Sequence, residues 1–244
     1  MAEIELLGAR GRMPVYVAEP EGDGPWPGVV IVHDAIGMSR DLCRQADWLA
    51  GAGYLVAAPD LFYYGIRLRC LFTTMRQWLK REGAVFEDIS AARDMLADRP
   101  DCTGRIGLIG FCLGGGFAVL MASGYGFDAS SVNYGAVPDD ALAVLEGACP
   151  IVGSYGADDR GLRDDPERMR AALRQLGIAH DIKVYPDTAH SFLNDHDRSE
   201  VPLWAIVMDK LTASRSDYVE ASATDARRRI VAFFDAHLKT LTGA

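Results

Sequence analysis

The chain has 244 residues, of which 49% are hydrophobic and 24% charged, and it carries a formal net charge of −9. This composition is typical of a soluble globular protein with a large core, and it excludes a disordered or fibrous chain. The acidic balance argues against nucleic acid as a partner, because phosphate binding requires clustered Lys and Arg.

The N-terminal stretch, MAEIELLGARGRM, lacks the continuous apolar core of a secretory signal. No later run approaches the roughly 18 apolar residues of a membrane span. We therefore expect a cytoplasmic protein with no membrane partner. In a reducing compartment disulfides are disfavoured, and the five cysteines show no CxxC spacing. Each thiol must be judged singly; they are Cys43, Cys70, Cys102, Cys112 and Cys149.

Strands are predicted along the whole chain. The first two, at 4–7 and 13–20, flank the turn GARGR and precede a Pro/Gly-rich connector. Next, VVIVH at 29–33 is a continuous β-branched run of the kind expected for a strand covered on both faces. Further strands are predicted at 54–59, 105–110, 131–135, 150–156 and 180–186.

Helical patterns alternate with these strands, at 40–53, 85–100, 114–124 and 165–177. In the fourth, Asp165 is the expected N-cap, Pro166 the first helical residue and Gly177 the stop. A last helix, roughly 224–241, should cover the sheet with an apolar stripe of Ile230, Phe233, Phe234 and Leu238. The alternation predicts an α/β fold, a mostly parallel central sheet with helices on both faces. Nothing forces a split, so we expect a single domain over residues 1–244.

The least regular stretches are residues 59–83 and 193–222. In a doubly covered parallel sheet, such connections lie over the carboxyl ends of the strands, where ligands bind. The first is rich in aromatic residues. These are either a wall of a binding site or part of the core.

The stretch GFCLGGG, residues 110–116, places Gly110-x-Cys112-x-Gly114 between a predicted strand and a predicted helix. Strand, tight turn and helix form the nucleophile elbow, here with Cys in place of Ser. Glycines are needed on both sides because a nucleophile held in a strained backbone leaves no room for neighbouring Cβ atoms. The alternatives are a buried structural cysteine and a phosphate loop. The second lacks both GxGxxG and a Lys-Ser/Thr ending.

An acidic pair and a histidine follow the elbow in chain order. Asp158 and Asp159 come directly after the strand PIVGSYG, and His190 lies in DTAHSF, after the strand HDIKVYP. Nucleophile, acid, histidine is the order of an α/β-hydrolase, in which each residue sits at the carboxyl end of its own strand. We therefore expect the three to converge. Either aspartate can also cap the following turn, and we favour Asp159 as the acid.

The other histidines have structural interpretations. His180 begins a strand, His196 lies in a polar loop and His237 lies on the last helix. His33 ends a strand at the same edge of the sheet and is kept as a candidate supporting residue. No cluster of His, Cys, Asp and Glu has the spacing of metal ligands, so we expect no metal.

Several motifs in register resemble the dienelactone hydrolase family of α/β-hydrolases, and the likeness runs from about residue 14 to the C-terminus. The motifs are PGVVIVHDAIG, GFCLGGG, YGADD, YPDTAHSF and ATDARRRIVAFFDAHL. The resemblance implies Cys112 as the nucleophile, His190 as base and then acid, and Asp159 as the group that orients the imidazole. It also implies an oxyanion hole made by the backbone N–H groups of Ala35 and Leu113.

The activity implied by the resemblance is that of a cofactor-free, carboxymethylenebutenolidase-like hydrolase. Its partner would be a small-molecule ester or lactone, cleaved through a thioester acyl-enzyme. Two alternatives stay open: a carboxylesterase or thioesterase of the same fold acting on a different, neutral substrate, and a non-catalytic binding scaffold with an idle cysteine. We expect a monomer or a weak homodimer.

The sequence departs from the family pattern at two points. Asp34 stands where the founding members have a Glu that helps to control the thiol, and a simple turn residue is an equally weighted interpretation. Those enzymes also hold a substrate carboxylate with an arginine shortly after the histidine, whereas no arginine follows His190 here until Arg198. Arg67 and Arg69 are candidate replacements.

Residues 196–217, HDRSEVPLWAIVMDKLTASRSD, look like an insertion relative to the family pattern. The apolar centre of this segment contains Leu203, Trp204 and Ile206. It forms either a lid or pocket wall over the substrate, with Trp204 as a candidate contact, or a short helix that packs for stability.

Overall fold

A computed structural model describes residues 2–197, 199–203 and 217–239 of the chain. Its centre is an eight-stranded sheet in the order β1-β2-β4-β3-β5-β6-β7-β8. The first two strands join antiparallel, and every pair from β4 to β8 is parallel. All eight predicted strands are present: β1 (Ala2–Gly8), β2 (Gly11–Ala18), β3 (Trp26–Val32), β4 (Leu55–Pro59), β5 (Cys102–Phe111), β6 (Ala129–Asn133), β7 (Ile151–Gly156) and β8 (His180–Tyr185).

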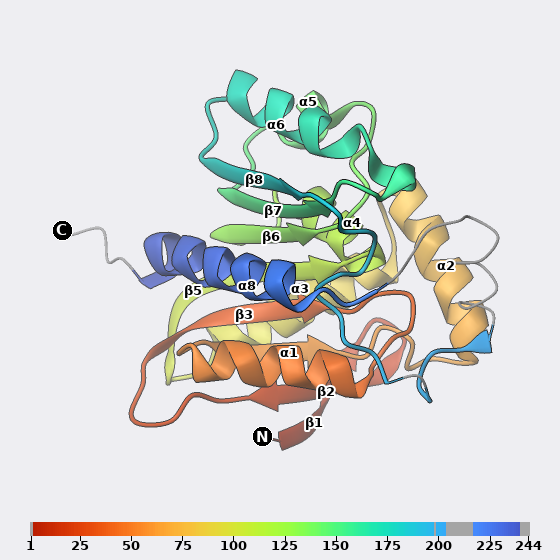
Figure 1. Ribbon diagram of the computed structural model, residues 1–244. Helices are drawn as coiled ribbons and strands as arrows, with labels where there is room; N and C mark the ends of the chain where they lie inside the picture. Colours follow the sequence, from red (N-terminus) through yellow and green to blue (C-terminus); the bar gives the residue numbers. More distant parts are fainter. Residues whose placement is uncertain (1, 198, 204–216, 240–244) are drawn as a thin grey trace.

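Helices cover both faces of the sheet, as predicted (Figure 1). One face carries α1 (Arg40–Gly51), α8 (Glu220–Phe234) and the π-helical continuation η2 (Asp235–Lys239). The other carries α3 (Ala84–Ala97), α4 (Leu113–Leu120) and α6 (Asp165–Gln175). The short α5 (Ala141–Val144) and the 3-10 turn η1 (Arg160–Leu162) were not predicted. The stripe of the last helix is confirmed, since Ile230, Phe234 and Leu238 are buried against the sheet and Phe233 packs at its margin.

Strand β3 shows why the central strands are continuously apolar. Val30 and Val32 face the core on one side of the sheet, and Val29 and Ile31 face the core on the other. Side chains alternate between the two faces of a strand. Because both faces are covered, neither set of positions meets water, and the alternation of polar and apolar residues disappears.

Residues 59–83 are more regular than the sequence suggested, because they contain α2 (Arg67–Lys80). The buried positions of this helix recur at helical spacing and are Cys70, Leu71, Thr74 and Gln77. Its outer side also carries exposed apolar residues, among them Phe72 and Leu79, and these hide the amphipathic pattern. Arg81, at φ 58°, ends the helix in a left-handed conformation. Figure 1 shows α2 beside the edge where the parallel strands end.

The start of α6 corrects the capping prediction. Asp164, not Asp165, is the N-cap, and Pro166 therefore lies one position further in. The carboxylate of Asp165 accepts the Val137 N–H at 2.9 Å and pairs with Arg168 at 2.6 Å. The Asp165 carboxylate therefore makes tertiary contacts and does not cap the helix. Gly177, at φ 68°, follows the helix as the predicted stop.

Most of the apparent insertion, including Trp204 and Ile206, lies outside the described residues. Whether this segment forms a lid over the substrate or a short packed helix therefore stays a prediction. Leu203, at the near end of that stretch, is 76% exposed. Within the described ranges, no helix has the length and apolar character needed to cross a membrane.

Strand β5 and helix α4 approach each other so closely that side chains do not fit between them. A Cβ atom added at Gly110 would lie 2.0 Å from the carbonyl oxygen of Gly114, and one added at Gly114 would lie 2.2 Å from that of Val32. Both contacts are with backbone, which cannot rotate away. The glycine spacing of the motif is therefore required by the crossing itself.

We expect Gly114→Ala to lower the free energy of unfolding by about 3 kcal/mol, because the added methyl forces β3 and α4 apart. Gly51→Ala is the matched control, since a Cβ there meets nothing within 4 Å. Urea unfolding followed by circular dichroism measures both. Equal stability of the two variants would contradict the crossing argument.

Candidate active site

Cys112 lies between β5 and α4 with φ 53° and ψ −113°, a conformation that costs energy for any residue with a side chain. Its N–H donates to the carbonyl oxygen of Asn133 at 3.0 Å, and its own carbonyl accepts the Gly116 N–H at 3.1 Å. These bonds fix the turn from both sides. The thiol is held at the carboxyl end of β5, only partly buried.

The turns after β7 and β8 are joined by backbone hydrogen bonds. The Ala157 N–H donates to the Tyr185 carbonyl oxygen at 2.8 Å, and the Asp158 N–H donates to the Thr188 carbonyl oxygen at 2.9 Å. As a result, Asp159 Oδ2 lies 2.6 Å from His190 Nδ1. Asp159 is 3% exposed, whereas Asp158 is exposed. The structure thus brings Asp159, the aspartate favoured from sequence, to the histidine.

The side chain of Cys112 also acts on the pKa of His190, through its charge and through hydrogen bonding. Since Nδ1 is engaged by Asp159, Nε2 is the ring nitrogen left for the sulfur. Burial alone would lower the pKa of His190, but the charge of Cys112 and the contact with Asp159 outweigh it and raise this pKa well above its ordinary value. The raised pKa favours the protonated imidazole at neutral pH.

The other thiols have surroundings of a different kind. All five cysteines are free. Burial raises the pKa of Cys43 and of Cys102, and it raises the pKa of Cys149 to about 12. Cys70 is fully buried, with its Sγ 3.4 Å from the Phe62 carbonyl oxygen. These four are placed as packing residues, whereas Cys112 faces a cationic imidazole.

Asp34 organises the loop after β3. Its Oδ1 accepts the Ile36 N–H at 2.8 Å, and its carbonyl accepts the Gly37 N–H at 3.2 Å. Its Oδ2 lies 2.7 Å from His196 Nε2. The turn interpretation of Asp34 therefore fits its geometry. His196 lies in a loop between two exposed aspartates, as expected, but its own side chain is 12% exposed and pairs with an acid.

The two candidate oxyanion donors lie on segments that meet beside the elbow. Leu113 opens α4, so its N–H has no acceptor within the helix. Ala35 follows Asp34, and both Ala35 and Leu113 pack against one small cluster formed by Phe62, Cys70 and Leu71. Within the described part of the chain, neither N–H has a hydrogen-bond acceptor.

His33 connects two loops at this edge. Its Nδ1 lies 2.7 Å from the Asp34 carbonyl oxygen, and its Nε2 accepts the Leu61 N–H at 3.1 Å. Burial lowers the pKa of His33, so the ring is neutral and donates through Nδ1. The side chain therefore ties the loop after β3 to the loop after β4.

A buried polar chain beside His190 was not anticipated from the sequence. The Tyr134 ring lies 5.1 Å from the His190 ring, centroid to centroid, and its hydroxyl donates to Asn194 Oδ1. Asn194 Nδ2 in turn donates to Asp41 Oδ2 at 2.6 Å. Burial raises the pKa of Tyr134 well above its ordinary value, so the phenol stays a neutral donor. This chain anchors the segment that follows His190.

The two candidate substrate-binding arginines, Arg67 and Arg69, lie in different surroundings. The Arg67 guanidinium lies 3.5 Å from the Met38 carbonyl oxygen, on the loop after β3. Arg69 instead lines a groove with Arg10 and Thr73 that includes neither Cys112 nor His190. Trp204 lies outside the described residues. In the described ranges, no group of three or more His, Cys, Asp or Glu side chains is arranged to hold a metal ion.

Comparison with known proteins places this chain among hydrolases. Residues 13–238 match the profile of the Dienelactone hydrolase family. A protein of Escherichia coli (strain K12) named "Putative carboxymethylenebutenolidase" is 29% identical, over 91% of this chain and 82% of its own length. The crystal structure of a "Putative Dienelactone Hydrolase" from Klebsiella pneumoniae superposes with a TM-score of 0.73 at 26% identity, covering 96% of this chain and 97% of that one.

A more distant structure supports the fold alone. Acylaminoacyl peptidase of Pyrococcus horikoshii matches 99% of this chain with a TM-score of 0.70 at 16% identity, and the match covers 42% of that enzyme. Together with the sheet order described above, these comparisons confirm the predicted α/β-hydrolase fold.

We expect Cys112→Ala to lower the pKa of His190, because the sulfur charge is the largest influence that raises it. Cys149→Ala is the control, since that thiol is protonated at neutral pH and should leave His190 unchanged. Titration of the imidazole by ¹H–¹³C NMR measures both. An unchanged His190 pKa in Cys112→Ala would show that the two side chains do not interact in solution.

Proposed function

The chain belongs to the dienelactone hydrolase family, and we propose that it is a cysteine-dependent hydrolase of a small ester or lactone. The family match and the hydrolase relatives support an enzyme that cleaves carboxylic ester bonds. The observation that carries the cysteine mechanism is the placement of Cys112 on a strained turn, against an imidazole held by a buried aspartate. The reaction then proceeds through a thioester acyl-enzyme.

In the first half-reaction, the Cys112 sulfur attacks the substrate carbonyl carbon and a C–S bond forms. The negative charge that develops on the carbonyl oxygen is met by the N–H groups of Ala35 and Leu113, which are fixed dipoles and need no reorganisation. Collapse breaks the C–O bond, and His190 gives its Nε2 proton to the leaving oxygen. In a lactone that oxygen stays attached to the acyl group.

The second half-reaction follows from a change of charge. Once the thioester has formed, the sulfur is neutral, and the largest influence that raises the pKa of His190 is gone. The pKa falls, so the imidazole, which has already given its proton to the leaving oxygen, stays neutral and then acts as the base that takes a proton from water. The resulting hydroxide attacks the thioester carbonyl, the thiolate leaves, and the cationic imidazole is restored.

In this cycle, Asp159 orients the imidazole of His190. Its carboxylate accepts the Nδ1–H of His190, with Nδ1 and Oδ2 2.6 Å apart. This leaves Nε2 as the nitrogen that serves the sulfur in the proposed cycle. With its second oxygen Asp159 accepts the Gly161 N–H at 3.2 Å, which fixes the orientation of the carboxylate. The acid therefore selects one tautomer and one ring position.

A neutral ester or a thioester is the second candidate substrate. It is favoured by the absence of an arginine between His190 and Arg198, since a substrate carboxylate needs a cationic partner. Arg67 is the one candidate cation that contacts the loop after β3, and its side chain is exposed. A ratio of rates on charged and uncharged substrates distinguishes the two classes.

We expect the wild-type protein to hydrolyse both dienelactone and a neutral aryl ester such as p-nitrophenyl acetate, and Cys112→Ala to lose both activities by at least about 1,000-fold. Cys149→Ala should retain both. Spectrophotometric initial rates measure the effect. If Cys112→Ala keeps wild-type rates, or if the wild type is inert on both substrates, the proposed mechanism is wrong.

The two aspartates give a second test. We expect Asp159→Asn to reduce kcat by about 10³- to 10⁴-fold, because an amide no longer fixes the productive tautomer. Asp158→Asn is the matched control one residue earlier, and its kcat should stay within about twofold of wild type. Comparable losses in both variants would assign the effect to the turn rather than to the carboxylate.

A further inference from the structure

The pair formed by Asp34 and His196 is the most buried acid–base contact that the proposed cycle leaves unused. The side chains are 7% and 12% exposed, and Nε2 lies 2.7 Å from Oδ2. Within the described residues, His196 Nδ1 is buried without a hydrogen-bond partner. Among the described residues, Asp34 is thus the only polar partner of this ring, and we infer that this contact is its role.

Asp34 is the residue on which the oxyanion loop depends. Its side-chain Oδ1 accepts the Ile36 N–H, and its carbonyl oxygen accepts the Gly37 N–H. Ala35 lies between Asp34 and Ile36, and its N–H is left unpaired among the described residues. The orientation of the Asp34 carboxylate therefore decides where the Ala35 N–H points, and the second oxygen of that carboxylate is held by His196.

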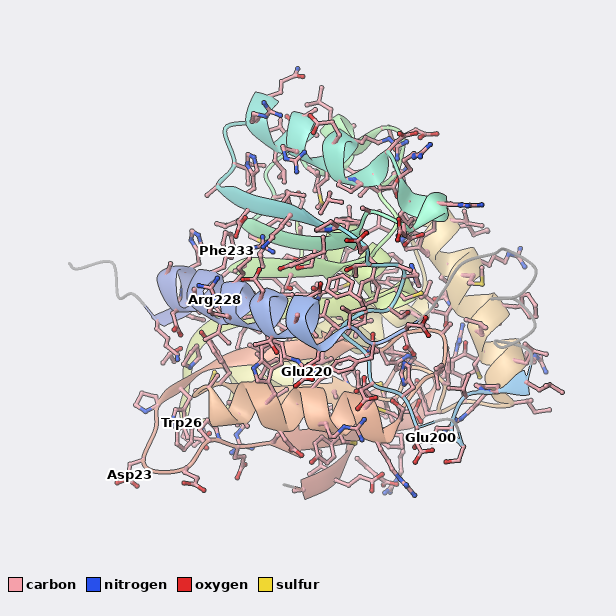
Figure 2. The ribbon with its side chains drawn as sticks, viewed as in Figure 1. Asp23, Trp26, Glu200, Glu220, Arg228 and Phe233 are labelled. Atoms are coloured by element: carbon pink, nitrogen blue, oxygen red, sulfur yellow. The ribbon has the colours of Figure 1, made fainter. Side chains whose placement is uncertain are left out.

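The segment that carries His196 is joined to α1 by hydrogen bonds. The Gln45 amide donates to the Leu193 carbonyl at 2.8 Å, and the Asp195 N–H donates to Asp41 at 3.1 Å. Beyond His196, the Glu200 carboxylate accepts the Arg40 N–H at the start of α1, at 3.2 Å. Glu200 is labelled in Figure 2. His196 thus presents its imidazole from a segment fixed on both sides.

We propose that His196 is a positioning residue. By holding Oδ2 of Asp34 it fixes the turn that presents the Ala35 N–H to the developing oxyanion. This inference rests on the proposed function, because it assigns a supporting partner to the same site. It also gives Asp34 a role other than control of the thiol, since both of its carboxylate oxygens are engaged away from Cys112.

Three variants separate this role from plain stabilisation. His196→Leu removes the donor to Asp34. His196→Gln restores it, because a glutamine amide also donates an N–H. Glu200→Ala loosens the same segment at Arg40 without touching Asp34. Each variant is assayed for kcat and KM with p-nitrophenyl acetate, and for the rate of Cys112 alkylation by iodoacetamide, a reaction that needs no oxyanion hole.

We expect His196→Leu to lower kcat by about 30-fold and to leave KM within about twofold of wild type. This fall in kcat is smaller than the one caused by complete removal of an oxyanion donor. His196→Gln should recover kcat to within about threefold of wild type, and Glu200→Ala should stay within about twofold. Alkylation of Cys112 should be unchanged in all three. A parallel fall in alkylation would assign the pair to the thiol, and an equal loss in Glu200→Ala would assign it to segment anchoring; either result overturns the proposal.

An NMR measurement tests the link between His196 and Ala35 without an activity assay. The ¹H–¹⁵N resonance of Ala35 should shift in His196→Leu and stay near its wild-type position in His196→Gln and Glu200→Ala. If the wild type hydrolyses neither substrate, the proposed function fails while this shift still tests the structural link. An unmoved Ala35 resonance in His196→Leu would overturn the link itself.

Discussion

The crossing of β5 and α4 at Cys112 is the constraint on which the rest of the site depends. The cysteine is held at φ 53° by one hydrogen bond to β6 and one within α4, and flanking glycines admit no side chain at the contact. A conformation this costly persists only where its surroundings over-determine it. The sheet supplies that surrounding, because β3, β5 and β6 are buried on both faces and cannot relax locally.

The parallel sheet also brings ionisable side chains together. Each parallel strand ends at one edge, so the turns after β5, β7 and β8 deliver a thiol, a carboxylate and an imidazole to one place. A cationic imidazole between two acidic partners is stable there because its contacts with Cys112 and Asp159 outweigh the desolvation of His190. Loss of either partner's charge changes the basicity of the ring. In the proposed mechanism, acylation of the sulfur is such a loss.

The sequence predicted those features that are local or that follow a strand. Cys112, Asp159 and His190 each come directly after a strand, and parallel topology then makes them neighbours without further information. Helix α2 was missed because its exposed outer face carries Phe72 and Leu79, so that apolar residues lie on all sides. The Asp34–His196 contact was missed for another reason. Its members are 162 residues apart in the chain, and neither stands in a pattern that points to the other.

Two His–Asp pairs on one short segment have different consequences. His190 and His196 both follow β8, and each meets a buried carboxylate from an earlier strand end, Asp159 after β7 and Asp34 after β3. In the proposed mechanism, the first pair holds a ring whose other nitrogen faces the sulfur, so its proton can move. The second pair holds a ring whose free nitrogen has no partner among the described residues, so its proton has no acceptor but Asp34. In the proposed mechanism, one segment thus carries the base, His190, and the positioning residue, His196. A displacement of that segment would then disturb the base and the proposed oxyanion donor together.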